Sequence, residues 1–438
     1  MGILQCPSSC CNNYSTSKHH EDHQQQSHHS NSNNTLLHSE SSTSSSLSSQ
    51  PSLPSVPSLT TSQQLQQKQE LVTAINGHSA IFSLALHGKF LYTGSSNSEI
   101  RRCRKDTFAP DHPNVLVATT NSAVKSITVF GDKLFTAHQD HKIRVWKIQE
   151  QEQEQEQPYK CIATLPTFND RFWKLFSSKN YVQVRRHKKR TWVHHVDTVS
   201  AVTVSVDGTL LYSASWDRTF KIWRTSDFKC LESVNAHEDA INALVVSRAG
   251  VAYTGSADKK IKIWKKVENS KKHQLVGTLE KHKSAVNALA LSGDGLVLYS
   301  GACDRSILVW EKEAEEEEGG EGNVKMVVVG ALRGHTKAIL CLVAVADLVV
   351  SGSADNSVRV WRRGINVKVS EKSCYSCLAV LEGHRRPVKC LAVAAESANN
   401  GGGGDDENSG GGGGSSYLVY SGSLDCDIRV WRIRVPLF

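Results

Sequence analysis

Short runs of alternating apolar and polar residues recur along most of the chain, separated by polar turns. Residues 213–223 show the pattern: Ser-Ala-Ser ends one apolar run, the turn Trp-Asp-Arg-Thr follows, and Phe-Lys-Ile-Trp alternates again. Alternation with a period of two predicts strands with one packed face, and a tight polar turn between them predicts a hairpin. The pattern therefore predicts an all-β fold of short antiparallel strands.

One unit of this pattern is repeated with a basal period of about 40–45 residues. Each complete copy has a His, a Ser or Thr four residues before an Asp, and a Trp six residues beyond that Asp. The complete copies are His195/Ser213/Asp217/Trp223, His237/Thr254/Asp258/Trp264, His282/Ser300/Asp304/Trp310, His335/Ser351/Asp355/Trp361 and His384/Ser421/Asp425/Trp431. Two earlier copies are incomplete: one has Asp140 and Trp146 but Asn121 near the His position, the other His78 out of register, Asn97 and Cys103.

This repeat resembles that of the WD-repeat β-propeller family, which has four strands per blade. Seven copies imply seven blades over residues 69–438. The chain ends just past the third strand of the last blade, so the outer strand of that blade must come from elsewhere. Residues 70–75, directly before the first copy, have the position and the pattern for it. Pairing the two ends of the ring in one blade would remove an exposed sheet edge.

The recurring His, Ser or Thr and Asp resemble a hydrolase triad. A nucleophile is needed once, however, and not in every copy. The resemblance implies instead a buried hydrogen-bond network, completed by the Trp, that ties each turn to its strand. We therefore expect no enzyme activity and no cofactor.

Residues 1–68 are rich in Ser, Gln, His and Asn, a composition that predicts a disordered arm because it buries too little apolar surface. Gly2 is placed for myristoylation, but Cys6 stands where Ser or Thr is usual, so lipidation is disfavoured. The Cys and His residues of the arm show no metal-ligand spacing.

Composition adds limits to this picture. The formal net charge is +8 and the twelve Cys show no disulfide spacing, and the start of the chain has no signal-peptide pattern. No apolar run is long enough to span a membrane. We expect a monomeric cytoplasmic or nuclear protein. Cys374 and Cys377 form a lone Cys-x-x-Cys pair, which does not predict a zinc or redox site.

We call the side of the ring that carries the His loops and the Asp turns the top face. Hydrophilic, low-complexity loops at 149–158, 311–323 and 397–416 are expected on the opposite, bottom face. On the top face we expect an insertion at 167–190. It predicts a short helix that Asp170 could cap, with Phe172 and Trp173 on one side, then a strand over 180–184. Its basic run consists of Arg185, Arg186, Lys188, Lys189 and Arg190.

The basic run has three interpretations: a partner contact or nuclear import signal, a solvated surface, or a nucleic-acid patch. The absence of interleaved aromatic residues disfavours direct nucleic-acid binding. Side chains just before each turn Asp are also expected on the top face: Gln139, Trp216, Ala257, Cys303, Ala354 and Leu424. Trp216 is the largest and a candidate contact, as are Lys283 and Arg385, which follow their repeat His. Trp216 could instead pack under the insertion.

The insertion also narrows the resemblance. The sequence Thr-Leu-Pro-Thr, then Asp-Arg, then NYVQVRRHKKR closely resembles the plant Jingubang-like WD-repeat proteins, which have an equivalent insertion after the second blade. That resemblance implies a non-enzymatic regulator that binds other proteins, in a family tied to pollen germination and tube growth. Similarity to the propellers of slime-mould myosin heavy-chain kinases is also expected, but no phosphate-binding loop is present.

The alternative function is that of a substrate receptor of a cullin–RING ubiquitin ligase. Such receptors usually carry Trp-Asp-x-Arg at a blade end, and no repeat Trp here starts that sequence.

Overall fold

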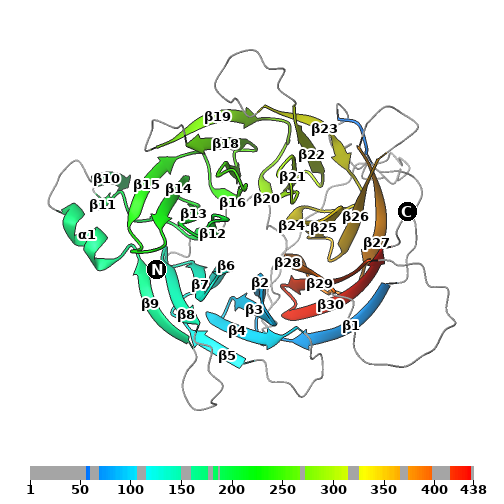
Figure 1. The fold of residues 1–438 in the computed structure, drawn as a ribbon, viewed down its shortest axis with the longest axis horizontal. Coiled ribbons are helices and arrows are strands. Elements are labelled where there is room, and N and C mark those ends of the chain that lie inside the picture. The colour runs from blue at the N-terminus through cyan, green and yellow to red at the C-terminus, as the bar shows by residue number, and fades with distance from the viewer. Residues whose placement is uncertain are drawn as a thin grey trace, which may run out of the picture. The chain divides into compact units, whose positions relative to one another are not determined.

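Twenty-eight of the described strands form seven four-stranded antiparallel sheets arranged in a ring, as the strand pattern predicts (Figure 1). The computed structural model describes residues 56–59, 69–105, 115–148, 159–175, 181–185, 188–266, 272–313, 325–365, 373–396 and 415–435. The predicted arm therefore lies almost wholly outside the described residues, and so do the loops at 149–158 and most of those at 311–323 and 397–416.

Each sheet is one blade, and its first strand is the innermost. The first four blades are β2 (Ile81–His87), β3 (Phe90–Ser95), β4 (Glu99–Arg104) and β5 (Val115–Thr119); β6 (Val124–Phe130), β7 (Lys133–His138), β8 (Ile143–Ile148) and β9 (Tyr159–Leu165); β12 (Val199–Val204), β13 (Leu210–Ser215), β14 (Thr219–Arg224) and β15 (Cys230–Asn235); β16 (Ile241–Val246), β17 (Ala252–Ser256), β18 (Ile261–Lys266) and β19 (His273–Leu279).

The last three blades continue the order. They are β20 (Val286–Leu291), β21 (Val297–Ala302), β22 (Ile307–Lys312) and β23 (Met326–Leu332); β24 (Ile339–Val345), β25 (Leu348–Ser353), β26 (Val358–Ile365) and β27 (Ser373–Leu381); β28 (Val388–Ala395), β29 (Ser415–Ser423), β30 (Asp427–Val435) and β1 (Gln69–Asn76). Since β22 extends to Lys312 and β29 begins at Ser415, the predicted bounds of the loops at 311–323 and 397–416 overlap these strands by two residues each.

The ring is closed by β1, as predicted. This strand pairs antiparallel with β30, from Gln69 opposite Ile433 to Asn76 opposite Asp427. The seventh blade also packs tightly on the first: a Cβ at Gly422 would come within 2.8 Å of Ile81 Cγ2, so only glycine fits there without a shift.

A belt of side-chain hydrogen bonds links each blade to the next near the ring axis. The link from Ser200 Oγ to Ile241 O is 2.6 Å long, and the link from Cys390 Sγ to Ile81 O returns to the first blade. The seven linking side chains, from the first blade to the seventh, are Ser83, Ser126, Ser200, Asn242, Asn287, Cys341 and Cys390. Apolar clusters between adjacent sheets form the rest of the core.

Two of the described segments lie outside the blades. The first is α1 (Phe168–Leu175) with the hairpin β10 (Tyr181–Arg185) and β11 (Lys188–Thr191), next to the outer strand β15 (Figure 1). The second is residues 56–59, which pair with β23 through a parallel bridge between Ser58 and Ala331. The prediction that the whole stretch 1–68 is disordered is therefore wrong for these four residues. The composition of the stretch is polar on average, and this average conceals the buried Val56 and the half-buried Leu59.

Candidate protein-interaction surface

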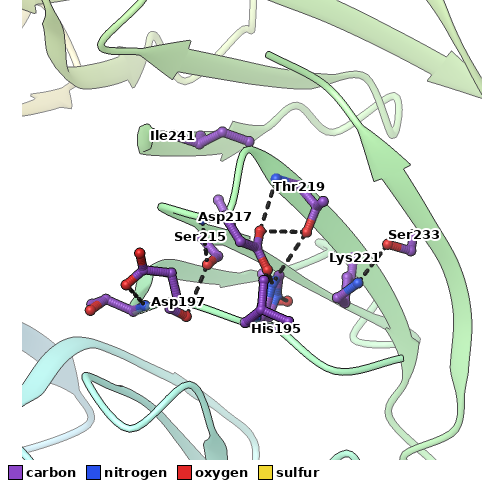
Figure 2. Close-up of polar contacts among 12 residues, drawn as sticks. His195, Asp197, Ser215, Asp217, Thr219, Lys221, Ser233 and Ile241 are labelled. Atoms are coloured by element: carbon purple, nitrogen blue, oxygen red, sulfur yellow. Dashed lines mark hydrogen bonds and ion pairs between the residues drawn. The ribbon is translucent and has the colours of Figure 1, made fainter. Parts of the chain in front are cut away.

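The repeat residues of the third blade form one continuous chain of hydrogen bonds. Trp223 Nε1 donates to Ser213 Oγ over 2.9 Å, Ser213 Oγ lies 2.8 Å from His195 Nε2, and His195 Nδ1 lies 3.0 Å from Asp217 Oδ2. Figure 2 shows the His195–Asp217 end of this chain, where Thr219 also donates to the carboxylate.

The donors fix the direction of this chain. An indole nitrogen only donates, so Ser213 Oγ accepts from Trp223. A carboxylate only accepts, so His195 donates through Nδ1 to Asp217, and the Nε2 of the neutral ring is left to accept the hydrogen of Ser213. Burial lowers the pKa of His195 despite the opposing effect of Asp217, which keeps the ring neutral as this direction requires. Ser213 has no exposed surface, so its hydroxyl is a structural bridge and is closed to a substrate.

The other four complete repeats contain the same chain. In each, the Trp Nε1 donates to the Ser or Thr hydroxyl over 2.8–3.1 Å, and that oxygen lies 2.7–2.8 Å from the His Nε2. The His Nδ1 lies 2.8–2.9 Å from the Asp Oδ2. The sets are His237, Thr254, Asp258 and Trp264; His282, Ser300, Asp304 and Trp310; His335, Ser351, Asp355 and Trp361; His384, Ser421, Asp425 and Trp431.

Burial limits these residues to a structural role. The four hydroxyl residues have no exposed surface, and the four Trp side chains are buried as well. None of them can therefore touch a partner protein or a substrate. The residues closed to contact are Thr254, Ser300, Ser351, Ser421, Trp264, Trp310, Trp361 and Trp431.

The second blade achieves the same bridge with a different residue. His138 stands at the end of β7, two residues after Thr136, and its Nε2 lies 2.8 Å from Thr136 Oγ1. Trp146 Nε1 donates to the same oxygen, as in the complete copies. Asp140 pairs instead with Arg144. Burial lowers the pKa of His138 to about 4. The sequence missed this residue because it lies on the strand and not in the His loop.

Trp216 lies at the top face, half-buried, near the ring axis. Its ring centroid is 5.9 Å from Lys125 Nζ, and that nitrogen is 4.1 Å from the ring of Phe82. Phe82 and Lys125 are the second residues of the innermost strands β2 and β6. The three side chains, which we call the aromatic–lysine cluster, thus join the first three blades. Cation–π contacts of this kind are favourable and hold the lysine in place.

The belt near the axis determines which blades have a second strand residue free for the top face. In blades three to five, the second residue of the innermost strand makes the inter-blade link, as Asn242 does to Val286 O. In the other blades the third residue makes it, as Ser83 and Ser126 do in blades one and two and Cys341 and Cys390 do in blades six and seven. The second residue, Phe82 or Lys125, is thereby released for the top face. A sequence search for this position would have found Phe82 and Lys125 together with Leu340 and Lys389.

The other predicted top-face residues differ in exposure. Lys283 and Arg385 are exposed, and their backbone nitrogens donate to Asp304 and Asp425, which fixes each loop. Of the residues before the turn Asp, Gln139 is exposed and the rest are half-buried: Trp216, Ala257, Cys303, Ala354 and Leu424.

The predicted place of the insertion on the top face is not what the structure shows. Asp170 accepts a 2.6 Å hydrogen bond from the backbone nitrogen of Cys230, the first residue of β15, at the bottom end of that outer strand. The helix therefore packs along the outer edge of the third blade. Asp170 does not cap α1; Thr167 does, because its Oγ1 accepts from Asp170 N. Local pattern revealed the helix but not its tertiary contact.

Trp216 is consequently not covered by the insertion, and the predicted contacts fall on two separate surfaces. On the helix, Phe172 stacks on Phe168 with ring centroids 5.9 Å apart, and Phe168 is 74% exposed. The basic run lies at the tip of the hairpin, where Arg185 pairs with Lys188, followed by Lys189 and Arg190. Arg186 and the side chain of Trp173 lie outside what the structure describes.

Among the described residues, no group of three or more His, Cys, Asp or Glu could hold a metal ion. Within that same part of the chain, no helix is long and apolar enough to cross a membrane. Cys374 and Cys377 both lie in β27 with free thiols.

The WD40 family model, described as "WD domain, G-beta repeat", matches residues 186–224, 228–265, 273–311, 326–362 and 375–432. These matches correspond to blades three to seven, the blades with a complete repeat network. The chain is thus a seven-bladed β-propeller built of WD repeats, a fold that is typically a non-enzymatic scaffold.

Curated relatives match over part of the chain. Protein ROOT INITIATION DEFECTIVE 3 of Arabidopsis thaliana is 29% identical over 39% of this chain and 40% of its own length. The Ribosome biogenesis protein WDR12 homolog of Drosophila erecta is 27% identical over 40% of this chain and 44% of its own. The CCR4-associated factor 4 homolog of Candida glabrata is 28% identical over 30% and 22%. The chain spans less than half the length of each of these relatives.

Proposed function

We propose that the protein is a non-enzymatic, monomeric regulatory scaffold that binds other proteins through the top face of its propeller. One observation carries the proposal: the aromatic–lysine cluster of Phe82, Lys125 and Trp216 stands at the top face, where half-buried Trp is the side chain most enriched at the centre of protein interfaces. The His, Ser and Asp groups that suggest catalysis are buried in the repeat network.

Charge supports the same face. Lys283 and Arg385 are exposed there, so a partner segment with acidic residues beside an apolar or aromatic anchor would match it. The insertion at the rim supports a finer assignment to regulators of the plant Jingubang type, acting in the cytoplasm or nucleus. Its basic hairpin tip is then an import signal or a second contact. The names of the curated relatives point to different processes, so these similarities do not choose a pathway.

The test is affinity purification from native tissue with two triple variants. The top-face variant is Trp216→Ala/Lys283→Glu/Arg385→Glu. Its matched control on the bottom face is Phe130→Ala/Lys89→Glu/Lys229→Glu, since Phe130 is 42% exposed and both lysines are exposed. Circular dichroism and thermal melting first establish that both variants fold.

We expect specific partners to be lost from the top-face variant and kept by the bottom-face control. If both variants keep the same partners as the unaltered protein, the top face is not the binding surface and the proposal fails. A third variant, with Lys188, Lys189 and Arg190 changed to Ala, separates import from contact: import alone changes the nuclear fraction and leaves the partners intact.

A further inference from the structure

Residues 56–59, Val-Pro-Ser-Leu, lie in a groove between the outer strands of the fifth and sixth blades (Figure 1, the short blue segment beside β23). On the side of the fifth blade, Leu59 N donates to Ala331 O and Ala331 N donates to Pro57 O, both over 2.9 Å. On the side of the sixth blade, Tyr375 N donates to Leu59 O over 3.1 Å. The four residues thus bridge the edges of two sheets by adding a strand to β23.

Arg333 adds a fourth hydrogen bond to the backbone of the segment. Its Nη2 donates to Val56 O over 2.7 Å. Proline at position 57 costs nothing here, because the bridge uses its carbonyl and needs no N–H from it. The backbone of the segment is therefore held at both ends and in the middle.

The two apolar side chains of the segment fill two separate recesses. Val56 is 4% exposed and packs in the core cluster that includes Leu279 and Met326. Leu59 packs against the neighbouring cluster and lies over Gly330, where an added Cβ would stand 2.3 Å from Leu59 Cγ. Pro57 and Ser58 face solvent. The two recesses therefore fit the first and fourth side chains of an extended peptide, which are Val and Leu in the segment Val-Pro-Ser-Leu.

The groove contacts of this segment are few, although Leu53–Phe438 form one compact unit. Four hydrogen bonds, the buried side chain of Val56 and the half-buried one of Leu59 are offset in large part by the entropy of ordering four residues. Occupancy then depends on the covalent tether, which supplies an effective concentration in roughly the millimolar range. A ligand held in this way can be displaced by a better one.

We propose that the groove between β23 and β27 is a docking site for extended peptides with Val and Leu at their first and fourth positions, that residues 56–59 are its resident ligand, and that a partner protein with such a motif displaces them. The site lies on the outer edge of the ring, so it stands independently of the proposed top-face function.

The first experiment uses the full-length chain and a fluorescent synthetic peptide with the sequence of residues 51–62. In the variant Val56→Asp/Leu59→Asp the resident ligand is disabled and the groove is open. We expect this variant to bind the peptide at least about tenfold more tightly than the unaltered protein, in which the tethered segment competes. The same peptide with both Asp substitutions should not bind.

The controls act on the groove. Gly330→Val, added to the open variant, places a side chain where Leu59 Cγ stands and should abolish peptide binding. Gly293→Val is the matched control, because a Cβ at Gly293 meets nothing within 4 Å, and it should leave binding intact. An open variant that melts normally yet binds no peptide would overturn the proposal, as would binding that survives Gly330→Val.

A second measurement covers the case in which the open variant does not fold. A protease site replaces residues 61–67 in the otherwise unaltered chain, and cutting it removes the tether. We expect the N-terminal fragment to separate from the propeller on size-exclusion chromatography at micromolar concentration, and excess peptide to speed its release. A fragment that stays bound throughout is a permanent fifth strand of the blade, and the docking site is then refuted.

Discussion

Each repeat Ser or Thr hydroxyl is hydrogen-bonded to two buried groups at once, so its loss affects both. Ser300 has no exposed surface; its Oγ accepts from Trp310 Nε1 over 2.8 Å and lies 2.7 Å from His282 Nε2. Removing it leaves two buried polar groups unpaired, and such groups are costly.

We therefore expect Ser300→Ala to lower the free energy of unfolding by about 3 kcal/mol. Chemical denaturation followed by tryptophan fluorescence measures the change. Ser226→Ala, at an exposed position, is the control and should stay within about 0.5 kcal/mol of the unaltered protein. A loss at Ser300 no larger than the control would show that the network contributes little.

His138 makes stability depend on pH. The unfolded chain binds this proton near pH 6.5, whereas burial lowers the pKa in the folded state to about 4. Acid therefore favours unfolding. The contribution of His138 to the free energy of unfolding is at its full value above pH 6.5 and decreases progressively as the pH falls towards 4. The shift corresponds to about 3 kcal/mol. Burial lowers the pKa of His195 and His384 too, so they add a loss in the same direction.

The prediction for His138 concerns how steeply the free energy of unfolding changes with pH in a variant and in the unaltered protein. His138→Gln should be less stable at pH 7.5, yet lose less stability between pH 6.5 and 4.5 than the unaltered protein does. Denaturant titrations across that range give both slopes. Parallel slopes would mean that His138 is protonated in the folded state as readily as in the unfolded chain.

Among single residues, the sequence predicted those that recur at a fixed spacing in the repeat. The five His–Ser/Thr–Asp–Trp sets were visible because each residue keeps its place in the repeat. His138 was not, because it reaches the same point in space from a different strand position. In the described part of blade one the repeat network is not formed, because Asn97 replaces the Asp and His78 is exposed. A cavity of about 10 Å³ lies between His78 and Thr93, with room for one water.

Among the elements, β1 is the strand that closes the ring. Val72 and Ile75 pack on the cluster between the seventh and first blades, and β1 pairs along its length with β30. Without β1, the outer edge of β30 is open to solvent and to other chains.

Replacing residues 69–76 with an equally long Gly-Ser segment should lower the unfolding free energy by several kcal/mol, since paired strands and buried side chains are both lost. Calorimetry should show one transition at a lower temperature, and dynamic light scattering should show self-association. The same replacement at residues 401–408, within the glycine-rich stretch, is the control. An unchanged melting temperature would show that the ring is held closed without β1.

The sequence predicted this element because its place was dictated by a missing strand. It also predicted the helix and hairpin of the insertion, but not their position. The hydrogen bond from Cys230 N to Asp170 joins residues that are sixty positions apart in the sequence, and neither the residue types nor their spacing predicts it. Residues 56–59 were missed for the opposite reason: two apolar residues in a polar arm carry no periodic pattern.

For the whole molecule, closure determines how the blades share their stability. In an open array of repeats, each unit depends on its two neighbours, and local damage stays local. Here the belt of links from Ser83 to Cys390 returns to Ile81, so every blade has two neighbours and none is terminal. Opening any one interface therefore weakens the same cooperative unit.

Hydrogen exchange tests this directly through Asn242, whose Nδ2 donates to Val286 O over 3.1 Å. Asn242→Ala removes one link of the belt and should cost about 1 kcal/mol, which speeds exchange through global unfolding about fivefold. In a closed ring the slowest amides of every blade, including β29 on the other side of the axis, should accelerate by that same factor. Ser226→Ala should change none of them. Acceleration limited to β16 and β20 would mean that the blades open one at a time, and the inner belt would then be a set of independent contacts.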